Sequence, residues 1–406
     1  MSKLTNLDYD IAIIGGGIVG LATAWQLIQA NPRKKIILIE KESDVGCHQT
    51  GHNSGVIHAG VYYNPGSLKA QFCKEGAKET KAFCHKYKIN FDVCGKLLVA
   101  TNNQELKRMQ ALYERCKNND IDIELLDKDE LKRREPNILG EAAIFVRDTG
   151  IVDYQKICRK LAELFEYNGG VLCLDSKVTG LKESKKEVTI EIGSRAITVG
   201  HLVTCSGLMA DRMTKMLGIP TNFQIIPFRG EYYKLPSAYD SIVHHLIYPI
   251  PDPDLPFLGV HLTRMIDGGV TVGPNAVQGW KREGYGRFNF SIKDTLQMLA
   301  FKGYWKLISQ HWRTGLKETH NSWIKSGYLK QVNKYCSLIN EDDLLPYPAG
   351  VRAQAVMADG SLVHDFLFAQ SPRTLHVCNA PSPAATSAFP IGRHIIDKID
   401  ELMTTF

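Results

Sequence analysis

A glycine-rich turn near the N-terminus constrains the fold of this chain more than any other feature. Residues 9–32, "YDIAIIGGGIVGLATAWQLIQANP", hold an apolar run, a glycine cluster and a helical pattern that ends at Asn31-Pro32, since proline disfavours helix in the preceding residue. A second apolar run, "KKIILIE", follows and ends at Glu40. The pattern predicts a strand, a tight turn, a helix and a second buried strand.

The spacing of the glycines predicts a dinucleotide site. Gly15, Gly17 and Gly20 fit G-x-G-x-x-G, and Glu40 follows Gly20 by 20 positions. In such folds the glycines permit a tight turn, close approach of a pyrophosphate and close helix packing, while the acid accepts ribose hydroxyls. Glycine turns also occur for structural reasons, but here every part stands in order. Adjacent residues expected at the same ligand are Ile18, Val19 and Lys41.

The loop after Glu40 distinguishes between dinucleotides. It reads "KESDVGCHQTGHNSGVIHAG", whereas a nicotinamide-binding unit usually continues into regular strands and helices. Small residues let a backbone pack against a flat ring and present amides to flavin oxygens. The loop therefore favours FAD, and the alternative is a flexible surface loop. The expected contacts here are Thr50, Gly51, Asn53, Ser54, Gly55 and Val56.

Composition limits the other classes of protein. The 406 residues are 44% hydrophobic and 23% charged, which suits two soluble domains. A net charge of +6 with no arginine-rich arm or zinc-finger spacing gives little reason to expect nucleic acid or a metal. The ten cysteines form no CxxC pair, and the N-terminus lacks the apolar core of a secretory signal. We expect a cytoplasmic protein without a transmembrane helix.

Two later segments repeat the strand, small-residue loop and helix pattern. They are "HLVTCSGLMADRM" at 201–213 and "LHVCNAPSPAATSAFPIGRHIIDKIDEL" at 375–402. The sequence therefore predicts an α/β chain, α+β overall, with a Rossmann-like FAD-binding domain made of 1–80, 148–219 and 346–406. Residues 81–147 and 220–345 are expected to form a second, mixed-sheet domain that covers the substrate. The further FAD contacts expected are Val178, Ser206, Gly207, Gly350, Pro383, Ala384, Ala385 and Thr386.

Longer stretches carry a resemblance to a known family. They are "HQTGHNSGVIHAGVYYNPGSLKA", "CGKLLVA", "TGIVDY", "FRGEYY", "FLGVHLTRMIDGGVTVGPNA" and "PAGVRAQ". Over nearly its whole length the chain resembles the L-2-hydroxyglutarate oxidase/dehydrogenase family of the D-amino-acid-oxidase-like FAD oxidoreductases. The resemblance implies oxidation of L-2-hydroxyglutarate, a small dicarboxylate hydroxy acid, to 2-oxoglutarate. It further implies hydride transfer to FAD, which we expect to be bound non-covalently, and reoxidation by a quinone or oxygen.

Rival functions remain open. One is another oxidoreductase of this superfamily that acts on an amino acid, a secondary amine or glycerol 3-phosphate. A nicotinamide dehydrogenase is a second. A non-catalytic or RNA-modifying flavoprotein is a third, supported only by the net positive charge.

The expected reaction needs a cation for a carboxylate, a base for the hydroxyl proton and a hydrogen that faces the flavin. Arg352 is the candidate that binds a substrate carboxylate. The resemblance implies this role, and the planar guanidinium of arginine can bind both carboxylate oxygens. The alternative is that Arg352 is a surface residue in a salt bridge. His58 and His261 are the candidate bases, because an imidazole titrates near neutrality. A lone histidine in a strand is more often structural, which applies to His261. Candidates for the second carboxylate are Tyr63, Arg229, Thr263 and Lys69.

Residues 299–335 hold seven Lys or Arg against one Glu, with Trp305, Trp312 and Trp323. Phe301, Trp305, Ile308 and Trp312 share a helical stripe. Within 290–335 we therefore expect either a helix in a membrane interface, on the inner face of the cell membrane, or a core helix with a solvated basic edge.

Overall fold

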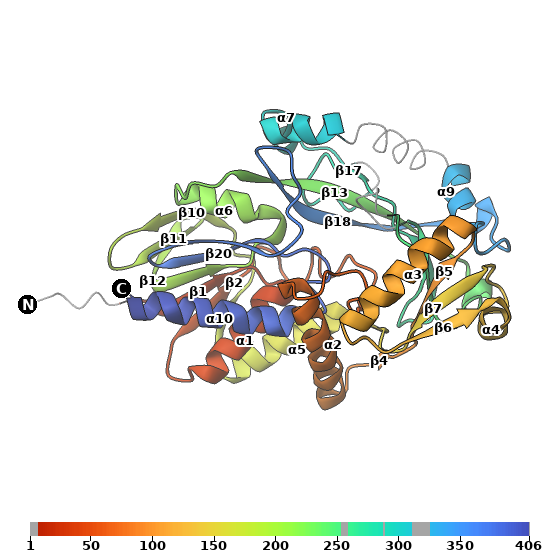
Figure 1. Ribbon diagram of the computed structural model, residues 1–406. Helices are drawn as coiled ribbons and strands as arrows, with labels where there is room; N and C mark the ends of the chain where they lie inside the picture. Colours follow the sequence, from red (N-terminus) through yellow and green to blue (C-terminus); the bar gives the residue numbers. More distant parts are fainter. Residues whose placement is uncertain (1–6, 253–258, 287–288, 311–324, 406) are drawn as a thin grey trace, which may run out of the picture.

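The computed structural model describes residues 7–252, 259–286, 289–310 and 325–405 (Figure 1). The first of two large sheets has the strand order β10-β11-β12-β1-β2-β9, with β20 paired to β12 and β19 paired to β20. Its strands are β1 (Tyr9–Ile14), β2 (Ile36–Ile39), β9 (Val171–Cys173), β10 (Val178–Glu183), β11 (Val188–Ile192), β12 (Arg195–Thr204), β19 (Leu367–Ser371) and β20 (Thr374–Asn379).

The centre of this sheet is parallel and apolar. Ile11 pairs with Ile36 in β2 and with His201 in β12, both in parallel register. Helices α1 (Ile18–Ala30), α5 (Tyr154–Tyr167) and α10 (Ala388–Thr405) lie together against one face (Figure 1). Continuous apolar strands are expected where helices cover a parallel sheet.

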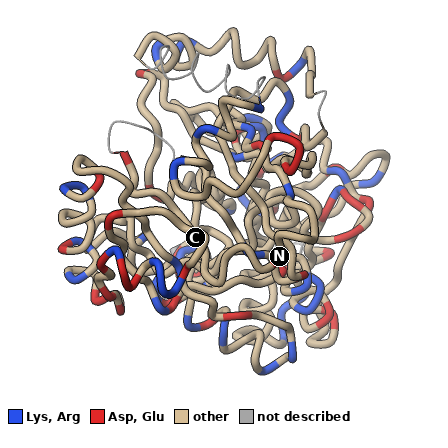
Figure 2. The backbone as a smooth tube through the Cα atoms, turned by 90° about the vertical axis from the view of Figure 1, so that its right-hand side faces the viewer, with Lys and Arg blue, Asp and Glu red and all other residues tan. Residues whose placement is uncertain are grey.

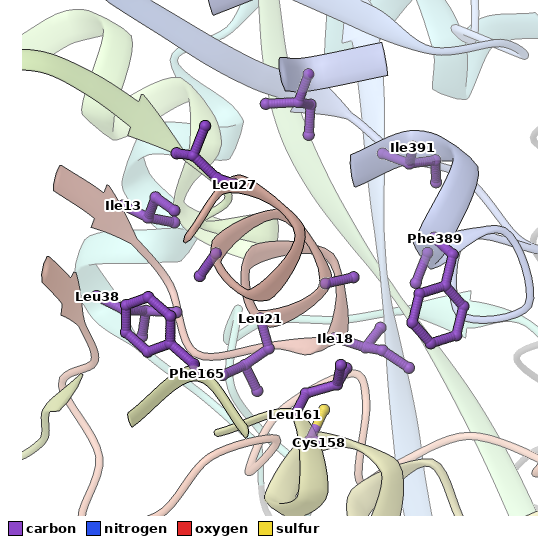
Figure 3. Close-up of a cluster of buried hydrophobic side chains, with 14 of the residues drawn as sticks. Ile13, Ile18, Leu21, Leu27, Leu38, Cys158, Leu161, Phe165, Phe389 and Ile391 are labelled. Carbon is purple, nitrogen blue, oxygen red and sulfur yellow. The ribbon is translucent and has the colours of Figure 1, made fainter. Parts of the chain in front are cut away.

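The core between sheet and helices is tightly packed (Figure 3). Leu21 of α1 lies between strand residues such as Ile13 and Leu38 and helix residues such as Leu161, and all four are fully buried. Truncating a leucine in such a site to alanine costs about 2–5 kcal/mol of folding stability. The helix that begins at the glycine turn is therefore held in a fixed place on the sheet.

The second large sheet has the order β17-β13-β16-β15-β14-β5-β7-β6, and β18 pairs with β13. Its strands are β5 (Lys96–Ala100), β6 (Ile123–Asp127), β7 (Ala142–Val146), β13 (Phe223–Lys234), β14 (Leu246–Pro249), β15 (His261–Arg264), β16 (Val270–Gly273), β17 (Val277–Gln278) and β18 (Leu345–Met357). A small third sheet joins β3 (Val56–Ile57), β8 (Gly150–Val152) and β4 (Phe91–Asp92).

The remaining helices lie at the surfaces and connections. They are α2 (Leu68–Tyr87), α3 (Asn103–Asn118), α4 (Lys128–Arg134), α6 (Ala210–Met216), α7 (Ile292–Leu299) and α9 (Lys325–Val332), with short 3₁₀ turns η1 (Gly207–Met209), η2 (Ser237–Tyr239) and η3 (Glu341–Asp343).

The strand and helix predicted around the glycine turn are confirmed as β1 and α1, followed by β2. Strand β18 differs from the expected segmentation. The sequence predicts residues 346–406 in the FAD-binding domain, but residues 346–357 pair along β13 in the second sheet, including Phe228 with Arg352. A long antiparallel partner decides this placement, and a local sequence pattern does not reveal it. The division into domains otherwise stays a prediction.

Residues 290–335, for which a membrane-interface helix or a core helix is expected, include α7 at their start and continue into a helix over 302–310. Tyr304 and Leu307 pack into a core cluster, whereas Trp305 is 56% exposed. Trp312 and Trp323 lie outside the described residues. Within the described part of the chain, no helix combines the length and apolar content needed to cross a bilayer.

Candidate functional site

A long cavity of about 540 Å³ runs between elements of the two large sheets. It is lined by the turn between β1 and α1, the loop after β2, the strands β13, β14, β15 and β18, and the loop before α10. Large cavities with a few convergent polar groups are typical of cofactor and substrate sites.

The glycine turn admits only glycine at two of its three positions. Gly15 has a φ of +115°, and a Cβ there would lie 2.4 Å from the Cys205 carbonyl oxygen. A Cβ on Gly20 would lie 2.0 Å from the Gly15 carbonyl oxygen, so Gly20 is needed for close packing of α1. Gly17 lines the cavity and has only the Thr50 hydroxyl nearby, at 3.5 Å. Helix α1 begins there without a side-chain cap, which leaves its N-terminus suited to a pyrophosphate.

Glu40 lies at the end of β2 and is held in place by backbone amides. Its two carboxylate oxygens accept hydrogen bonds from the Gly16 amide at 2.6 Å and the Glu42 amide at 3.0 Å. A carboxylate has about four lone-pair sites, so Glu40 can still accept from hydroxyls in the cavity that it lines. This arrangement fits the ribose of FAD.

The loop after Glu40 forms a packed wall of the cavity. Thr50 accepts a hydrogen bond from the Ile18 amide at 3.1 Å. Asn53 donates to the carbonyl oxygens of Gln49 and Thr50 and accepts from the Gly55 amide. These contacts argue against the alternative of a loose surface loop.

The loop before α10, near the C-terminal end of the sequence, forms another wall of the cavity. Thr386 is fully buried, and its hydroxyl bonds the Tyr154 hydroxyl at 2.9 Å and accepts from the His58 amide at 3.1 Å. The buried Ser206 hydroxyl has no hydrogen-bond partner within the described residues, and Ser206 lines the cavity. An orphaned polar atom in a cavity wall suits a polar cofactor.

Most of the predicted FAD contacts converge on this cavity. Those that line it are Gly15, Gly17, Ile18, Val19, Glu40, Lys41, Thr50, Asn53, Ser54, Val56, Val178, Ser206, Gly207, Gly350, Pro383, Ala384, Ala385 and Thr386. Gly20, Gly51 and Gly55 lie behind the lining, where a Cβ would clash with a backbone oxygen. We interpret these three glycines as packing residues of the wall.

Both candidate bases line the cavity. Burial, with the positive charges of Lys96 and other neighbours, lowers the pKa of His58 to about 3. Burial likewise lowers the pKa of His261 to about 4, and its Nδ1 lies 3.1 Å from the Gly259 carbonyl oxygen. The ring of His261 stacks on Tyr248 with centroids 3.8 Å apart. Neither histidine therefore has the ordinary imidazole pKa that sequence reasoning assumed.

Both candidate arginines line the cavity. Arg352 projects from β18 into the cavity, where its side chain is exposed. Arg229 also lines the cavity, but it forms an ion pair with Glu231 and donates to the Gly286 carbonyl oxygen at 3.2 Å. Arg352 therefore stays a candidate for binding a substrate carboxylate.

The other candidates for the second carboxylate stand outside the lining. Lys69 Nζ lies 4.8 Å from the ring centroid of Tyr63. Burial, with the charge of Arg352, lowers the pKa of Lys69 to about 8, so the two cations are electrostatic neighbours. Thr263 is fully buried in β15.

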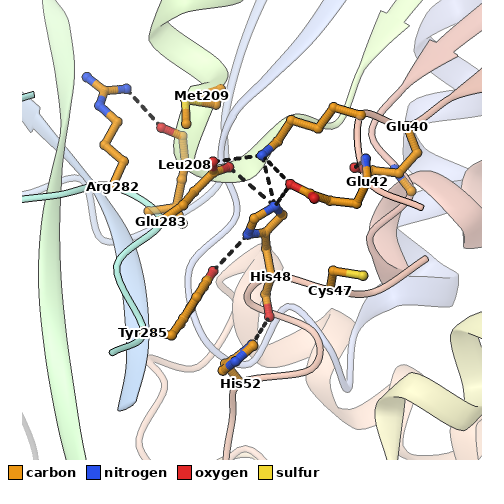
Figure 4. A network of polar contacts seen from close by, with 12 residues as sticks. Glu40, Glu42, Cys47, His48, His52, Leu208, Met209, Arg282, Glu283 and Tyr285 are labelled. Atoms are coloured by element: carbon orange, nitrogen blue, oxygen red, sulfur yellow. Dashed lines mark hydrogen bonds and ion pairs between the residues drawn. The ribbon is translucent and has the colours of Figure 1, made fainter. Parts of the chain in front are cut away.

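Sequence reasoning missed a polar network that joins the loop after β2 to residues 283–285 (Figure 4). Lys41 Nζ lies 2.8 Å from Glu42, 2.9 Å from His48 and 2.7 Å from Glu283. His48 also contacts the Tyr285 hydroxyl at 3.3 Å. Glu42, His48 and Glu283 have ligand atoms close enough for a metal ion, but the ammonium of Lys41 bonds all three. No spacing in the sequence indicates this long-range contact.

Comparison with known proteins places the chain in a family. The family described as "FAD dependent oxidoreductase" matches residues 10–398. The chain is 56% identical over 398 residues to L-2-hydroxyglutarate dehydrogenase of Escherichia coli (strain K12), a match that covers 98% of this chain and 94% of that protein. It belongs to the L-2-hydroxyglutarate dehydrogenases of the FAD-dependent oxidoreductase family. The resemblance drawn from the sequence is thereby confirmed, and with it FAD as the cofactor of an oxidoreductase.

More distant relatives support the same family and fold. The mitochondrial L-2-hydroxyglutarate dehydrogenase of Homo sapiens is 41% identical over 412 residues, which cover 97% of this chain and 89% of that protein. The FAD-bound, dithionite-reduced L-alpha-glycerophosphate oxidase of Mycoplasma pneumoniae has a TM-score of 0.79 at 21% identity, covering 97% of this chain and 94% of that one. Glycine oxidase of Geobacillus kaustophilus has a TM-score of 0.73 at 15% identity, with 97% and 95% covered. These two structures confirm the predicted FAD-binding fold with a second domain.

Proposed function

We propose that this chain oxidises L-2-hydroxyglutarate to 2-oxoglutarate with FAD bound non-covalently. The observation that carries the proposal is the convergence of Arg352, His58 and His261 on the cavity that also holds the glycine turn and Glu40. The membership of the family supports the substrate. FAD, when bound, supplies the acceptor for a hydride equivalent.

The chain's own residues have two tasks in this reaction. Arg352 binds the carboxylate next to the hydroxyl carbon through two of its guanidinium nitrogens, which orients the carbinol hydrogen toward the cofactor. A neutral imidazole accepts the hydroxyl proton as the carbon–hydrogen bond breaks and the ketone forms. Because the pKa of both His58 and His261 is low, the imidazoles are neutral at physiological pH.

We favour His58 as the base and Lys69 as the partner of the second carboxylate. His261 is held by its stacking on Tyr248 and its contact with the Gly259 carbonyl oxygen, which suits a residue that supports the site. Lys69 adds a second cation near Arg352, whereas Arg229 is engaged with Glu231.

The experiment that tests the proposal is the absorption spectrum of the purified protein before and after anaerobic L-2-hydroxyglutarate. We expect an oxidised flavin spectrum that is bleached by this compound within seconds. Glycerol 3-phosphate, glycine and other amino acids should leave it unchanged. Bleaching by one of those compounds alone would assign the chain to another activity of the superfamily. A colourless protein that takes up no FAD would contradict the proposal altogether.

For the electron acceptor we propose a quinone reached at a membrane surface. Exposed apolar side chains gather on α7 and the neighbouring segments, namely Trp280, Phe290, Ile292, Leu296 and Trp305. Lys293, Lys302 and Lys306 stand among them in the sequence. Lys and Arg also appear in the upper part of Figure 2, the side where Figure 1 places α7. Apolar residues flanked by lysines are typical of interfacial binding.

Co-sedimentation with vesicles of phosphatidylcholine and phosphatidylglycerol tests this contact. Ile292→Asp with Leu296→Asp should release the protein, whereas Tyr167→Asp, at a residue that is 88% exposed at the end of α5, should not. A wild-type protein that does not sediment with the vesicles would overturn the membrane proposal and leave oxygen as the favoured acceptor, whereas equal binding in all three proteins would exclude α7 as the contact.

A further inference from the structure

A lysine is buried beside the candidate bases without a hydrogen-bond partner. Lys96 opens β5 between β14 and β7 and is completely buried. Its ammonium makes no hydrogen bond within the described residues. Lysine is rarely buried without a partner, because its charge loses hydration. Such a residue costs stability, so a compensating role is expected.

The surroundings of the ammonium are aromatic and lack carboxylates among the described residues. Nζ lies 4.9 Å from the ring centroid of Tyr62 and 5.1 Å from that of Tyr248. These contacts stabilise a cation only partly. The titratable groups that act on Lys96 or feel its charge are Tyr62, Tyr248, Cys73 on α2, Cys116 on α3, His58 and His261.

Two contacts link Lys96 to the cavity. Tyr248 lies between Lys96 and the cavity, and its ring stacks directly on His261. The charge of Lys96 also acts on both histidines, and on His58 it is the largest contribution after burial. His58 further feels Lys69 and Arg352, so Lys96 is one of three cations around it.

We propose that Lys96 is a positioning residue for proton transfer, whose buried ammonium contacts Tyr248, the residue stacked on His261, and adds to the effect of burial in disfavouring protonation of His261 and His58. The inference deepens the proposed function, because it rests on one of these imidazoles acting as the base. A like charge nearby disfavours protonation. Binding of the doubly negative substrate offsets that charge, so the imidazole gains proton affinity when the hydroxyl proton must be accepted.

Histidine labelled with ¹³C at Cε1 tests the proposal in the FAD-loaded enzyme. His58→Gln and His261→Gln assign the two signals. In the wild type both imidazoles should stay neutral down to pH 5. In Lys96→Met both should titrate roughly one pH unit higher, so that protonation is visible near pH 5. Lys96→Arg keeps the charge and should behave as the wild type.

Stability and kinetics separate this role from packing. Lys96→Met removes an unpartnered buried charge, so its thermal midpoint should equal or exceed that of the wild type, and Lys96→Gln serves if Met does not fold. Anaerobic flavin reduction should lose rate at acid pH in Lys96→Met and not in Lys96→Arg. Unshifted imidazoles in a folded Lys96→Met would overturn the proposal. Shifted imidazoles with an unchanged pH–rate profile would support the role of Lys96 and overturn the assignment of a histidine as the base.

Discussion

Lys41 Nζ lies 2.7 Å from the carboxylate of Glu283, although 242 positions separate the two residues in the chain. Both line the cavity, and their side chains are 26% and 20% exposed. The pair links the loop after β2, which follows Glu40, the residue expected to bind ribose, to the segment after β17. The pair therefore forms part of the cavity wall near the residues expected to hold the cofactor.

Glu283→Gln should weaken FAD retention. An ion pair with this exposure contributes up to about 1 kcal/mol, so we expect FAD to dissociate up to about fivefold more readily, with a smaller difference at high salt. Fluorescence of released FAD during dialysis measures this. Glu141→Gln breaks the exposed pair with Lys128 and is the matched control. Equal retention in both variants would show that the Lys41–Glu283 pair does not hold the cofactor.

Glu40→Ala should weaken FAD binding more strongly. The substitution removes the acceptor of the Gly16 amide and the expected acceptor of ribose hydroxyls. A hydrogen bond to a charged group contributes about 1.5–3 kcal/mol, so binding should fall by roughly tenfold to a hundredfold. Titration of the apoprotein with FAD gives the dissociation constant, and circular dichroism checks the fold. A constant within twofold of the wild type would remove Glu40 from the site.

Arg352→Lys should lower kcat/KM and leave FAD bound. Lysine keeps the charge but loses the planar fork that binds both carboxylate oxygens. We expect a loss of about tenfold to a hundredfold, equivalent to about 1.5–3 kcal/mol. Steady-state kinetics with L-2-hydroxyglutarate measures it. Arg373→Lys, which changes an arginine bound to the Lys185 and Gly200 carbonyl oxygens, should have little effect; near-normal turnover in Arg352→Lys would refute carboxylate binding by Arg352.

Lys69→Met should raise KM for the dicarboxylate. If Lys69 binds the distal carboxylate, a hydroxy acid that lacks this group, such as L-2-hydroxybutyrate, should be affected much less. The ratio of kcat/KM values for the two compounds should fall by roughly tenfold, the effect of one charged contact of about 1.4 kcal/mol. An unchanged ratio would direct attention to Tyr63 or Thr263.

His58→Gln should slow anaerobic flavin reduction by roughly a hundredfold to ten-thousandfold, the range for loss of a general base. The neutral imidazole is the active form, and its pKa in the folded protein is about 3 for His58 and about 4 for His261. The wild-type rate should therefore be constant above about pH 5, which lies one to two units above these pKa values. The rate should decrease only at lower pH. A rise centred near pH 6.5 would contradict the buried, neutral imidazole. If His261→Gln shows the larger loss, the two roles are reversed.

The local sequence determined the nucleotide-binding unit. Gly15 must adopt a positive φ and Gly20 must pack against a backbone oxygen, and only glycine meets both conditions. The apolar runs of β1 and β2 have the length and composition of buried parallel strands. These requirements act between residues close in sequence, so spacing reveals them. The longer motifs likewise identified the family.

Tertiary structure alone decided the membership of β18, the cavity behind Arg352 and the charges around the histidines. Residues 346–357 read as part of the cofactor domain until β13 supplied a strand partner. In the sequence, Lys96 is an ordinary first residue of a strand. Its electrostatic effect on His58 depends on burial and on neighbours that lie far apart in the chain. Desolvation and Coulomb forces depend on distances in space, whereas glycine geometry and apolar periodicity are local. The sequence by itself therefore determined the cofactor and the family, and the folded chain decided the protonation states and the partners of the residues at the site.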